Sequence, residues 1–389
     1  MKRLLSLALS AFLCLAAGAQ EFHSLWIVPK KTAIGAASPI GSGEVTPLEH
    51  GWEFSIPVGR MPAGSYIEWD FTISATSDAP EFYAVEYFDQ GRWKVSDTLR
   101  CTRTADSTKE LTTELRTLRL EDAIGRGNIQ LRLRAVSDGV GRPKFVHADN
   151  TAASVRFLGT QAPRDTIRVL CIGNSFTYVA GSSWMLKEIA WSQGHYIDMQ
   201  DALKGGQTFG QHLALTVTAD KVAAGGYDHV FLQNQSQTNA WYAQDRKGKS
   251  QILDDAVELA ARVREHSPRA RLWFEQTWSY PGKDNGGFAS LSEFDRLLSA
   301  GTRRMASATK ASVSPIGKAF AICRSERPDI PMYASDDKHQ SEYGAYLKAC
   351  VNYLLMFREP FGSGVQDCSL DPDKTAYLRR VASRVTGVR

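Results

Sequence analysis

The architecture of this chain can be predicted from one stretch, Ile167-Arg168-Val169-Leu170-Cys171-Ile172-Gly173-Asn174-Ser175-Phe176-Thr177. Its first part is a short, mostly apolar run, which is typical of a strand buried in a parallel sheet, and the glycine after it indicates a turn. Ligand sites of open α/β sheets form beyond the carboxyl ends of their strands, so Ser175 is placed where it can meet a ligand. The alternative interpretation of Ser175 is a turn residue or a helix N-cap.

Downstream of this stretch, apolar strands alternate with amphipathic helices, as in a parallel sheet covered on both faces. Further strands are expected up to about residue 205 and over 229–232, 271–278 and 330–334. Helices are expected over 183–193, 252–263, 291–307, 315–324, 341–358 and 371–384. In the second of these helices, apolar residues three and four apart predict a buried stripe: Ile252, Leu253, Ala256, Val257, Ala260 and Val263.

Upstream, residues 21 to about 160 have short alternating or aromatic-rich runs separated by Gly, Pro, Asp and Ser. This pattern predicts an all-β sandwich, with strands near 65–74, 81–88, 92–95, 113–120, 128–136 and 154–158. Its aromatic residues indicate either core packing or a carbohydrate-binding face: Trp52, Tyr66, Trp69, Tyr83, Tyr87 and Trp93. We therefore expect an accessory β-sandwich domain over 20–160 and an α/β domain over 161–389.

The first nineteen residues have the pattern of a signal peptide. Lys2 and Arg3 precede the apolar run 4–16, and Ala17-Gly18-Ala19 is a small-x-small cleavage site. We expect cleavage after residue 19 and export to the periplasm or the extracellular space, since both destinations use this signal. No later stretch approaches the roughly 20 apolar residues that a membrane helix needs, so no membrane span is expected.

The composition excludes several classes of partner and cofactor. The chain has 389 residues, and its 46 Lys and Arg against 42 Asp and Glu give a net charge of +4, too small for the basic surface typical of nucleic-acid binding. The sequence has no CxxC pair and no HExxH motif, so neither a metal site nor an organic cofactor is predicted. Cys350 and Cys368 flank a helix end and could form a disulfide.

A candidate base for Ser175 lies near the C-terminus. A serine hydroxyl needs a neighbouring base to act as a nucleophile, commonly a histidine oriented by a carboxylate. Of the eight histidines, only His339 has an aspartate three residues before it, in Asp336-Asp337-Lys338-His339. One turn can present both side chains, with Asp336 orienting His339 and Asp337 as the rival carboxylate. The alternative is an exposed polar loop.

Two loops after expected strands offer hydrogen-bond donors for an oxyanion. In Gly205-Gly206-Gln207-Thr208, the backbone N–H of Gly206 can approach a substrate with no Cβ in the way, although the glycine pair could simply form a tight turn. The other loop is Gln233-Asn234-Gln235-Ser236. If it is extended, Gln233 and Gln235 share one face, so we expect Gln235, and after it Gln233, to donate. A tight turn would favour Asn234 instead.

Together these segments resemble the four blocks of the SGNH hydrolase superfamily, also called GDSL esterases, over about 167–358. The fourth block continues into Gln340-Ser341 and Gly344-Ala345-Tyr346-Leu347. The resemblance implies a flavodoxin-like three-layer α/β/α domain with a parallel sheet, in which Ser175 is the nucleophile, His339 the base and Asp336 its orienting acid. It also implies an oxyanion hole formed by the N–H groups of Ser175 and Gly206.

Two departures from the family pattern stand out. Asn174 occupies the position at which many members have aspartate, so the charge beside the nucleophile is altered. The third block usually reads Gly-x-Asn-Asp, whereas the same register gives Gln233-Asn234-Gln235-Ser236 here.

The expected activity is hydrolysis of an ester by Ser175 without a cofactor. Export, a nearly neutral net charge and the β domain favour O-acetyl groups on an external glycan, which members of this superfamily in such a setting commonly remove; a small-molecule ester is the other substrate class. Aromatic residues near the strand ends could stack on sugar rings or belong to the core: Trp241, Tyr242, Trp273, Trp278 and Tyr280. The alternative function is a non-catalytic carbohydrate-binding protein with this fold.

Overall fold

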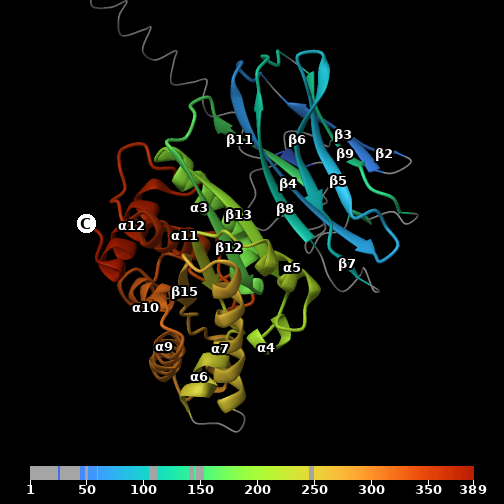
Figure 1. Ribbon diagram of the computed structural model, residues 1–389. Helices are drawn as coiled ribbons and strands as arrows, with labels where there is room; N and C mark the ends of the chain where they lie inside the picture. The colour runs from blue at the N-terminus through green and yellow to red at the C-terminus, as the bar shows by residue number, and fades with distance from the viewer. Residues whose placement is uncertain are drawn as a thin grey trace, which may run out of the picture. The chain divides into compact units, whose positions relative to one another are not determined.

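The computed structural model describes residues 25–26, 44–48, 51–58, 60–104, 112–125, 127–139, 144–145, 153–244 and 249–389. The signal peptide predicted over 1–19 lies outside these residues. The chain packs into two units (Figure 1). One comprises the described residues between 1 and 32, between 37 and 101 and between 116 and 161, and the other comprises the described residues between 102 and 115 and between 162 and 389.

The first unit is a β sandwich of two sheets. One sheet has the antiparallel order β2 (Glu44–Leu48), β3 (Gly51–Val58), β9 (Gly127–Ala135), β5 (Phe82–Asp89) and β6 (Arg92–Arg100). The other has the order β1 (Leu25–Trp26), β11 (Ala153–Gly159), β4 (Ser65–Thr76) and β10 (Lys144–Phe145), with β7 (Arg103–Thr104) and β8 (Thr112–Leu120) also paired to β4.

Side chains of both sheets share one apolar core, because alternate residues of each strand point inward. Leu131 and Leu133 of β9 and Ile67 and Trp69 of β4 are all at most 1% exposed within it. Trp69 and Tyr83, two of the aromatic residues considered for carbohydrate binding, belong to this core. The predicted β sandwich is therefore confirmed, and these two side chains pack inside it.

The second unit is built on a parallel sheet. Its strands lie in the order β13 (His195–Leu203), β12 (Asp165–Gly173), β14 (His229–Leu232), β15 (Arg271–Glu275) and β16 (Ser312–Ser314). In chain order within the unit this is 2-1-3-4-5, the flavodoxin-like arrangement. The flavodoxin-like prediction is confirmed.

Helices cover both faces of this sheet (Figure 1). The longer ones are α3 (Ser182–Ser192), α5 (Thr216–Ala224), α7 (Lys249–His266), α9 (Leu291–Ala308), α10 (Ile316–Glu326), α11 (Glu342–Phe357) and α12 (Pro372–Thr386). The shorter ones are α2 (Ser175–Tyr178), the 3-10 turn η1 (Val179–Gly181), α4 (Phe209–His212), α6 (Thr238–Ala243) and α8 (Gly282–Gly287).

Successive residues of β12 enter two different cores, which is why its run is apolar without alternation. Val169 and Cys171 pack in the core that contains side chains of α3 and α11. Leu170 and Ile172 pack in the core that contains side chains of α5 and α7. This gives the three layers predicted for the α/β domain, with the carboxyl end of β12 at Gly173.

Several local predictions differ from the structure. β15 ends at Glu275, and 330–334 forms only a bridge between Tyr333 and Gln340, because the chain turns back at once. In α7, Val257 is 42% exposed and Leu259 is buried in its place. Cys350 and Cys368 are free thiols, so the bridge considered between them is absent. Within the described ranges, no helix combines the length and apolarity needed to cross a membrane.

Candidate active site

Ser175 lies in the first turn of α2, directly beyond the carboxyl end of β12. The N-cap of this helix is Asn174, whose side-chain oxygen accepts a hydrogen bond from the backbone N–H of Phe176 at 3.1 Å. Gly173 at the end of the strand lets the Gln233 side chain lie close to the backbone, because a Cβ at this position would lie 2.7 Å from Oε1 of Gln233. Ser175 is thus neither a cap nor part of the buried core, and its side chain is half-buried.

The structure brings Ser175, His339 and Asp336 together. Nε2 of His339 lies 2.8 Å from Oγ of Ser175, and Nδ1 lies 2.5 Å from Oδ2 of Asp336. Since the carboxylate only accepts, Nδ1 carries the proton and Nε2 is left to accept from the serine hydroxyl. Asp337, the rival carboxylate, has a positive φ of 53° and is exposed, while its backbone carbonyl accepts from Gly282 N–H at 3.0 Å.

Asp336 fixes its own turn as well as the imidazole. Its Oδ1 accepts the backbone N–H groups of Lys338 at 3.1 Å and His339 at 2.9 Å. Partial burial acts to raise the pKa of Asp336, but hydrogen bonds from the His339 ring and from these two N–H groups outweigh it, so the pKa lies below its ordinary value. The carboxylate is therefore ionised at neutral pH, as an orienting acid must be.

Aromatic packing supports the turn that carries His339. Nε1 of Trp278 donates to the backbone carbonyl of Lys338 at 3.0 Å. The Trp278 ring is stacked between Phe176 and Phe320, with centroids 4.4 and 4.3 Å away. Trp278 is 1% exposed, so it is a structural support and not a sugar-stacking surface. Trp273 and Tyr280 are likewise buried.

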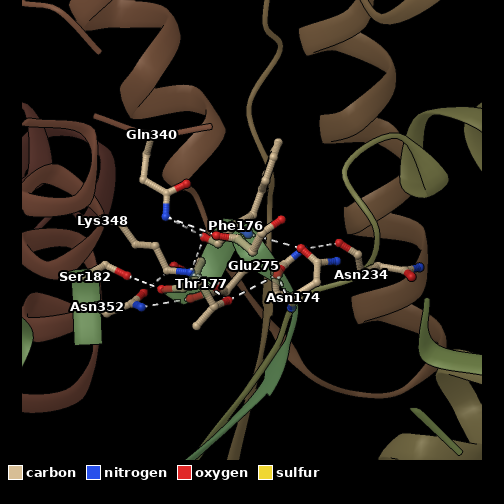
Figure 2. Close-up of polar contacts among 12 residues, drawn as sticks. Asn174, Phe176, Thr177, Ser182, Asn234, Glu275, Gln340, Lys348 and Asn352 are labelled. Atoms are coloured by element: carbon tan, nitrogen blue, oxygen red, sulfur yellow. Dashed lines mark hydrogen bonds and ion pairs between the residues drawn. The ribbon is translucent and has the colours of Figure 1, made fainter. Parts of the chain in front are cut away.

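Gln340 has a structural role that our reasoning from the sequence missed. It is fully buried, and its Nε2 donates to the backbone carbonyls of Val179 at 2.7 Å and Phe176 at 3.3 Å. These carbonyls lie in the segment that follows Ser175, as Figure 2 shows for Phe176. The residue directly after His339 thus connects the turn of His339 to the turn of Ser175, and its position next to His339 was the available signal in the sequence.

The loop after β13 contains Gly206, the residue predicted to supply a backbone donor. Gly206 has φ of +74°, and a Cβ placed on it would meet nothing within 4 Å, so the space beside it is open. Nδ2 of Asn174 donates to the carbonyl of Gln207 at 2.9 Å, which ties this loop to the nucleophile turn. Ser175 lies in a first helical turn, where backbone N–H groups have no intrahelical acceptor.

The amides of the loop after β14 are engaged with other protein groups. Gln233 accepts from the backbone N–H of Asn174 at 2.9 Å, and its nitrogen donates to the backbone of Asn234. The amide nitrogen of Asn234 donates to Asn239 at 3.2 Å, and that of Gln235 to Ser236 at 3.1 Å. A side-chain oxyanion donor from this loop would have to leave its present partner, which is easiest for the half-buried Gln235.

Among the residues with described side chains, no group of three or more His, Cys, Asp or Glu is arranged to hold a metal ion.

Comparison with known proteins gives matches in structure only. No protein-family model matches the chain, and no curated protein matches it in sequence. A DUF4886 family protein from Bacteroides uniformis has a TM-score of 0.49 and 18% identity, with 58% of this chain and 97% of that one covered.

A carbohydrate esterase family 2 enzyme with a carbohydrate-binding domain, from Corynascus thermopiles, has a TM-score of 0.37 and 14% identity, over 83% and 97% of the two chains. An acetylxylan esterase from Geobacillus stearothermophilus, as a catalytic mutant, has a TM-score of 0.35 and 14% identity, over 49% and 95%. The resemblance to the SGNH hydrolases is confirmed at the level of the fold, because the strand order of the second unit is the one that it implies.

Proposed function

We propose that this chain is a serine ester hydrolase of the SGNH type, with Ser175 as nucleophile, His339 as general base and Asp336 as orienting acid. The observation that carries the proposal is the continuous hydrogen-bond path through the three side chains, 2.8 Å from Ser175 to His339 and 2.5 Å from His339 to Asp336. This path activates a hydroxyl by giving its proton a base of the correct tautomer.

The first half of the reaction forms an acyl-enzyme. Oγ of Ser175 attacks the ester carbonyl carbon while its proton passes to Nε2 of His339, and the carboxylate of Asp336 stabilises the imidazolium. The negative oxygen of the tetrahedral intermediate accepts hydrogen bonds from the N–H groups of Ser175 and Gly206. Collapse breaks the bond to the alcohol, which leaves with the proton from His339.

The second half releases the acid. A water molecule gives a proton to Nε2 of His339 and attacks the acyl carbon, and the same N–H groups hold the new oxyanion. Collapse breaks the bond to Oγ, which recovers the proton and leaves a free carboxylic acid. These steps require no metal or organic cofactor.

For the substrate, we infer O-acetyl groups on a periplasmic or extracellular glycan. The signal-peptide pattern of residues 1–19, the nearly neutral net charge and the β sandwich that precedes the α/β unit support this choice. In this proposal residues 20–160 form an accessory domain, and 161–389 carry the catalytic groups.

The test is release of acetate from acetylated xylan, other acetylated glycans and a small aryl acetate. Ser175→Ala is expected to reduce kcat/KM by about 10³-fold or more, because it removes the only nucleophile of the mechanism. Ser250→Ala, an exposed serine of α7, is the matched control and should retain wild-type activity. Equal rates for wild type and Ser175→Ala would contradict the proposal and favour a non-catalytic carbohydrate-binding protein.

A further inference from the structure

A buried ion pair that the proposed reaction does not use lies beside the nucleophile turn. Oε2 of Glu275, at the end of β15, lies 2.7 Å from Nζ of Lys348 in α11, and both side chains are 3% exposed. Figure 2 shows the two residues next to Thr177 and the backbone of Phe176.

The ammonium of Lys348 has two further acceptors, and both belong to α2. Nζ donates to the backbone carbonyl of Phe176 at 3.1 Å and to Oγ1 of Thr177 at 3.1 Å. All three N–H groups of the ammonium are thus used. Two of them hold the residues that directly follow Ser175.

The other side of the pair is anchored in the sheet and in α11. Oε1 of Glu275 accepts from Asn352, one turn after Lys348 in α11, at 2.9 Å, and Asn352 in turn accepts from Ser314 of β16 at 2.8 Å. Neither charged side chain can therefore move without breaking several buried hydrogen bonds.

The same network reaches the residue before Ser175. The Thr177 hydroxyl donates to Oε1 of Gln233 at 3.1 Å, and this oxygen also accepts the backbone N–H of Asn174 at 2.9 Å. Hydrogen bonds that begin at Lys348 and continue through Thr177 and Gln233 thus hold the backbone on both sides of Ser175.

A buried ion pair adds little net stability to a fold, because the cost of desolvation offsets much of the attraction between the charges. Apolar residues of similar volume often stabilise the fold equally well. An apolar side chain at position 348 could not donate to the Phe176 carbonyl. α2 has only four residues, too few to be stable by its own hydrogen bonds. Stability alone therefore does not account for an ion pair at this position.

We propose that Glu275 and Lys348 are positioning residues that fix Ser175 for attack through the Phe176 carbonyl and the Thr177 hydroxyl; this inference rests on the proposed serine hydrolase function. The Phe176 carbonyl accepts from both Lys348 and Gln340, so the turns of nucleophile and base are held by one helix and the residues before it. A displacement of about 1 Å in such an arrangement can cost about 10²-fold in rate.

The test is the double variant Glu275→Leu/Lys348→Met, which removes both charges at similar volume and leaves no unpaired buried ion. It should fold with nearly the wild-type Tm, while kcat on the aryl acetate falls about 100-fold and KM changes less than about threefold. Single-turnover acylation of Ser175 should slow in parallel. A merely structural pair would change Tm without this split between kcat and KM.

Asp367→Leu/Arg379→Met is the control, a less buried ion pair at 2.6 Å outside the turns of Ser175 and His339, and should retain the wild-type kcat. A folded Glu275→Leu/Lys348→Met enzyme with wild-type kcat would overturn the positioning proposal. Failure of the proposed function is seen separately, as activity that survives Ser175→Ala.

If the double variant does not fold, Thr177→Val tests the positioning proposal instead. We expect about a tenfold loss of kcat at constant KM, and a wild-type kcat would overturn the inference.

Discussion

At the scale of single residues, Asn174 shows what an amide does beside the nucleophile where many SGNH hydrolases have aspartate. Its oxygen accepts from Phe176 N–H at 3.1 Å, and its nitrogen donates to the Gln207 carbonyl at 2.9 Å. A carboxylate could do the first but not the second, because it has no donor. Asn174 therefore joins the turn of Ser175 to the loop of Gly206.

Asn174→Asp is expected to lower kcat about tenfold or more. The substitution places a carboxylate against a carbonyl oxygen and releases the loop that carries an oxyanion donor, whose loss elsewhere costs about 10²–10³ in kcat. Steady-state kinetics on the aryl acetate measure the effect. Gln207→Ala is the control, because it keeps the backbone carbonyl that Asn174 contacts, and it should stay within about twofold of wild type. Wild-type kcat in Asn174→Asp would refute the role given to the amide.

Asp336→Asn is expected to lower kcat by about 10³–10⁴, because an amide can hold the imidazole in the wrong tautomer. Asp337→Asn should stay within about twofold, since Asp337 is exposed and asparagine tolerates its positive φ. Measuring kcat/KM for both variants at pH 7 to 8 shows which of the two carboxylates orients His339. Comparable losses in the two variants would mean that the turn, not the specific contact with His339, is what matters.

The four blocks taken together were enough to predict that Ser175, His339 and Asp336 meet, because a strand end and a short Asp-x-x-His turn restrict where those side chains can lie. The directions of Gln233, Asn234 and Gln235 could not be predicted in this way. β14 ends at Leu232, and the side-chain oxygen of Asn234 accepts from the backbone N–H of Phe209, the first residue of α4, at 3.1 Å. The alternation of side chains along a strand does not predict contacts with residues of another element.

At the scale of elements, α4 places a second histidine behind the nucleophile strand. Nε2 of His212 donates to the Gly173 carbonyl at 2.9 Å, and Nδ1 accepts from Thr218 at 3.0 Å. Burial lowers the pKa of His212 to about 4, even though the bond to Gly173 favours the charged form. Burial also lowers the pKa of His229 in β14 to about 4. Both rings are neutral in the folded enzyme above that pH.

These two histidines make the free energy of unfolding fall as the pH is lowered from about 6.5 to 4. In this window the unfolded chain binds protons that the folded chain does not, which costs up to about 1.4 kcal/mol per pH unit for each ring. Urea unfolding at pH 7.5, 6 and 5 measures the slope. His212→Gln, which can still donate to Gly173, should reduce the slope; an unchanged slope would show that His212 does not contribute to it.

The helices that long periodic patterns predicted are present, whereas the short strand predicted over 330–334 is reduced to the bridge between Tyr333 and Gln340. The interior of α7 follows its 3.6-residue period, but the exact residues of the stripe shift because Leu259 reaches the core and Val257 does not. The segment Gly282–Gly287 is a short turn in which Lys283, Asp284 and Asn285 have positive φ. Asp284 and Asn285 are of residue types enriched at positive φ, whereas lysine is not, so the conformation of Lys283 in particular could not be predicted from its residue type.

At the scale of the whole molecule, the proposed catalytic groups Ser175, His339 and Asp336 and all the hydrogen bonds given for them lie in the second unit, while the first unit has a core of its own. The change of hydrophobic period near residue 160 was enough to predict the two architectures. That the described residues between 102 and 115 group with the second unit could not be predicted, because the hydrophobic period indicates local structure and not the unit to which a segment belongs.

Leu131→Ala and Leu259→Ala compare the two units. Both side chains are fully buried, and each truncation should cost about 2–5 kcal/mol of stability in its own core. We expect Leu259→Ala to lower the temperature at which esterase activity is lost. Leu131→Ala should lower a calorimetric transition but leave kcat/KM at 25 °C within about twofold of wild type. A tenfold loss of kcat/KM in Leu131→Ala would mean that catalysis depends on the sandwich core.

The contacts of Gln340 and Lys348 with the same Phe176 carbonyl have a consequence for how this chain can change in length. Each residue added to or removed from a helix rotates the rest of that helix by about 100°, since a turn has 3.6 residues. An insertion or deletion between positions 340 and 348 would turn the ammonium away from its carbonyl acceptor, and no side-chain adjustment could restore it. We therefore expect length variants of this short interval to be inactive even when they are folded.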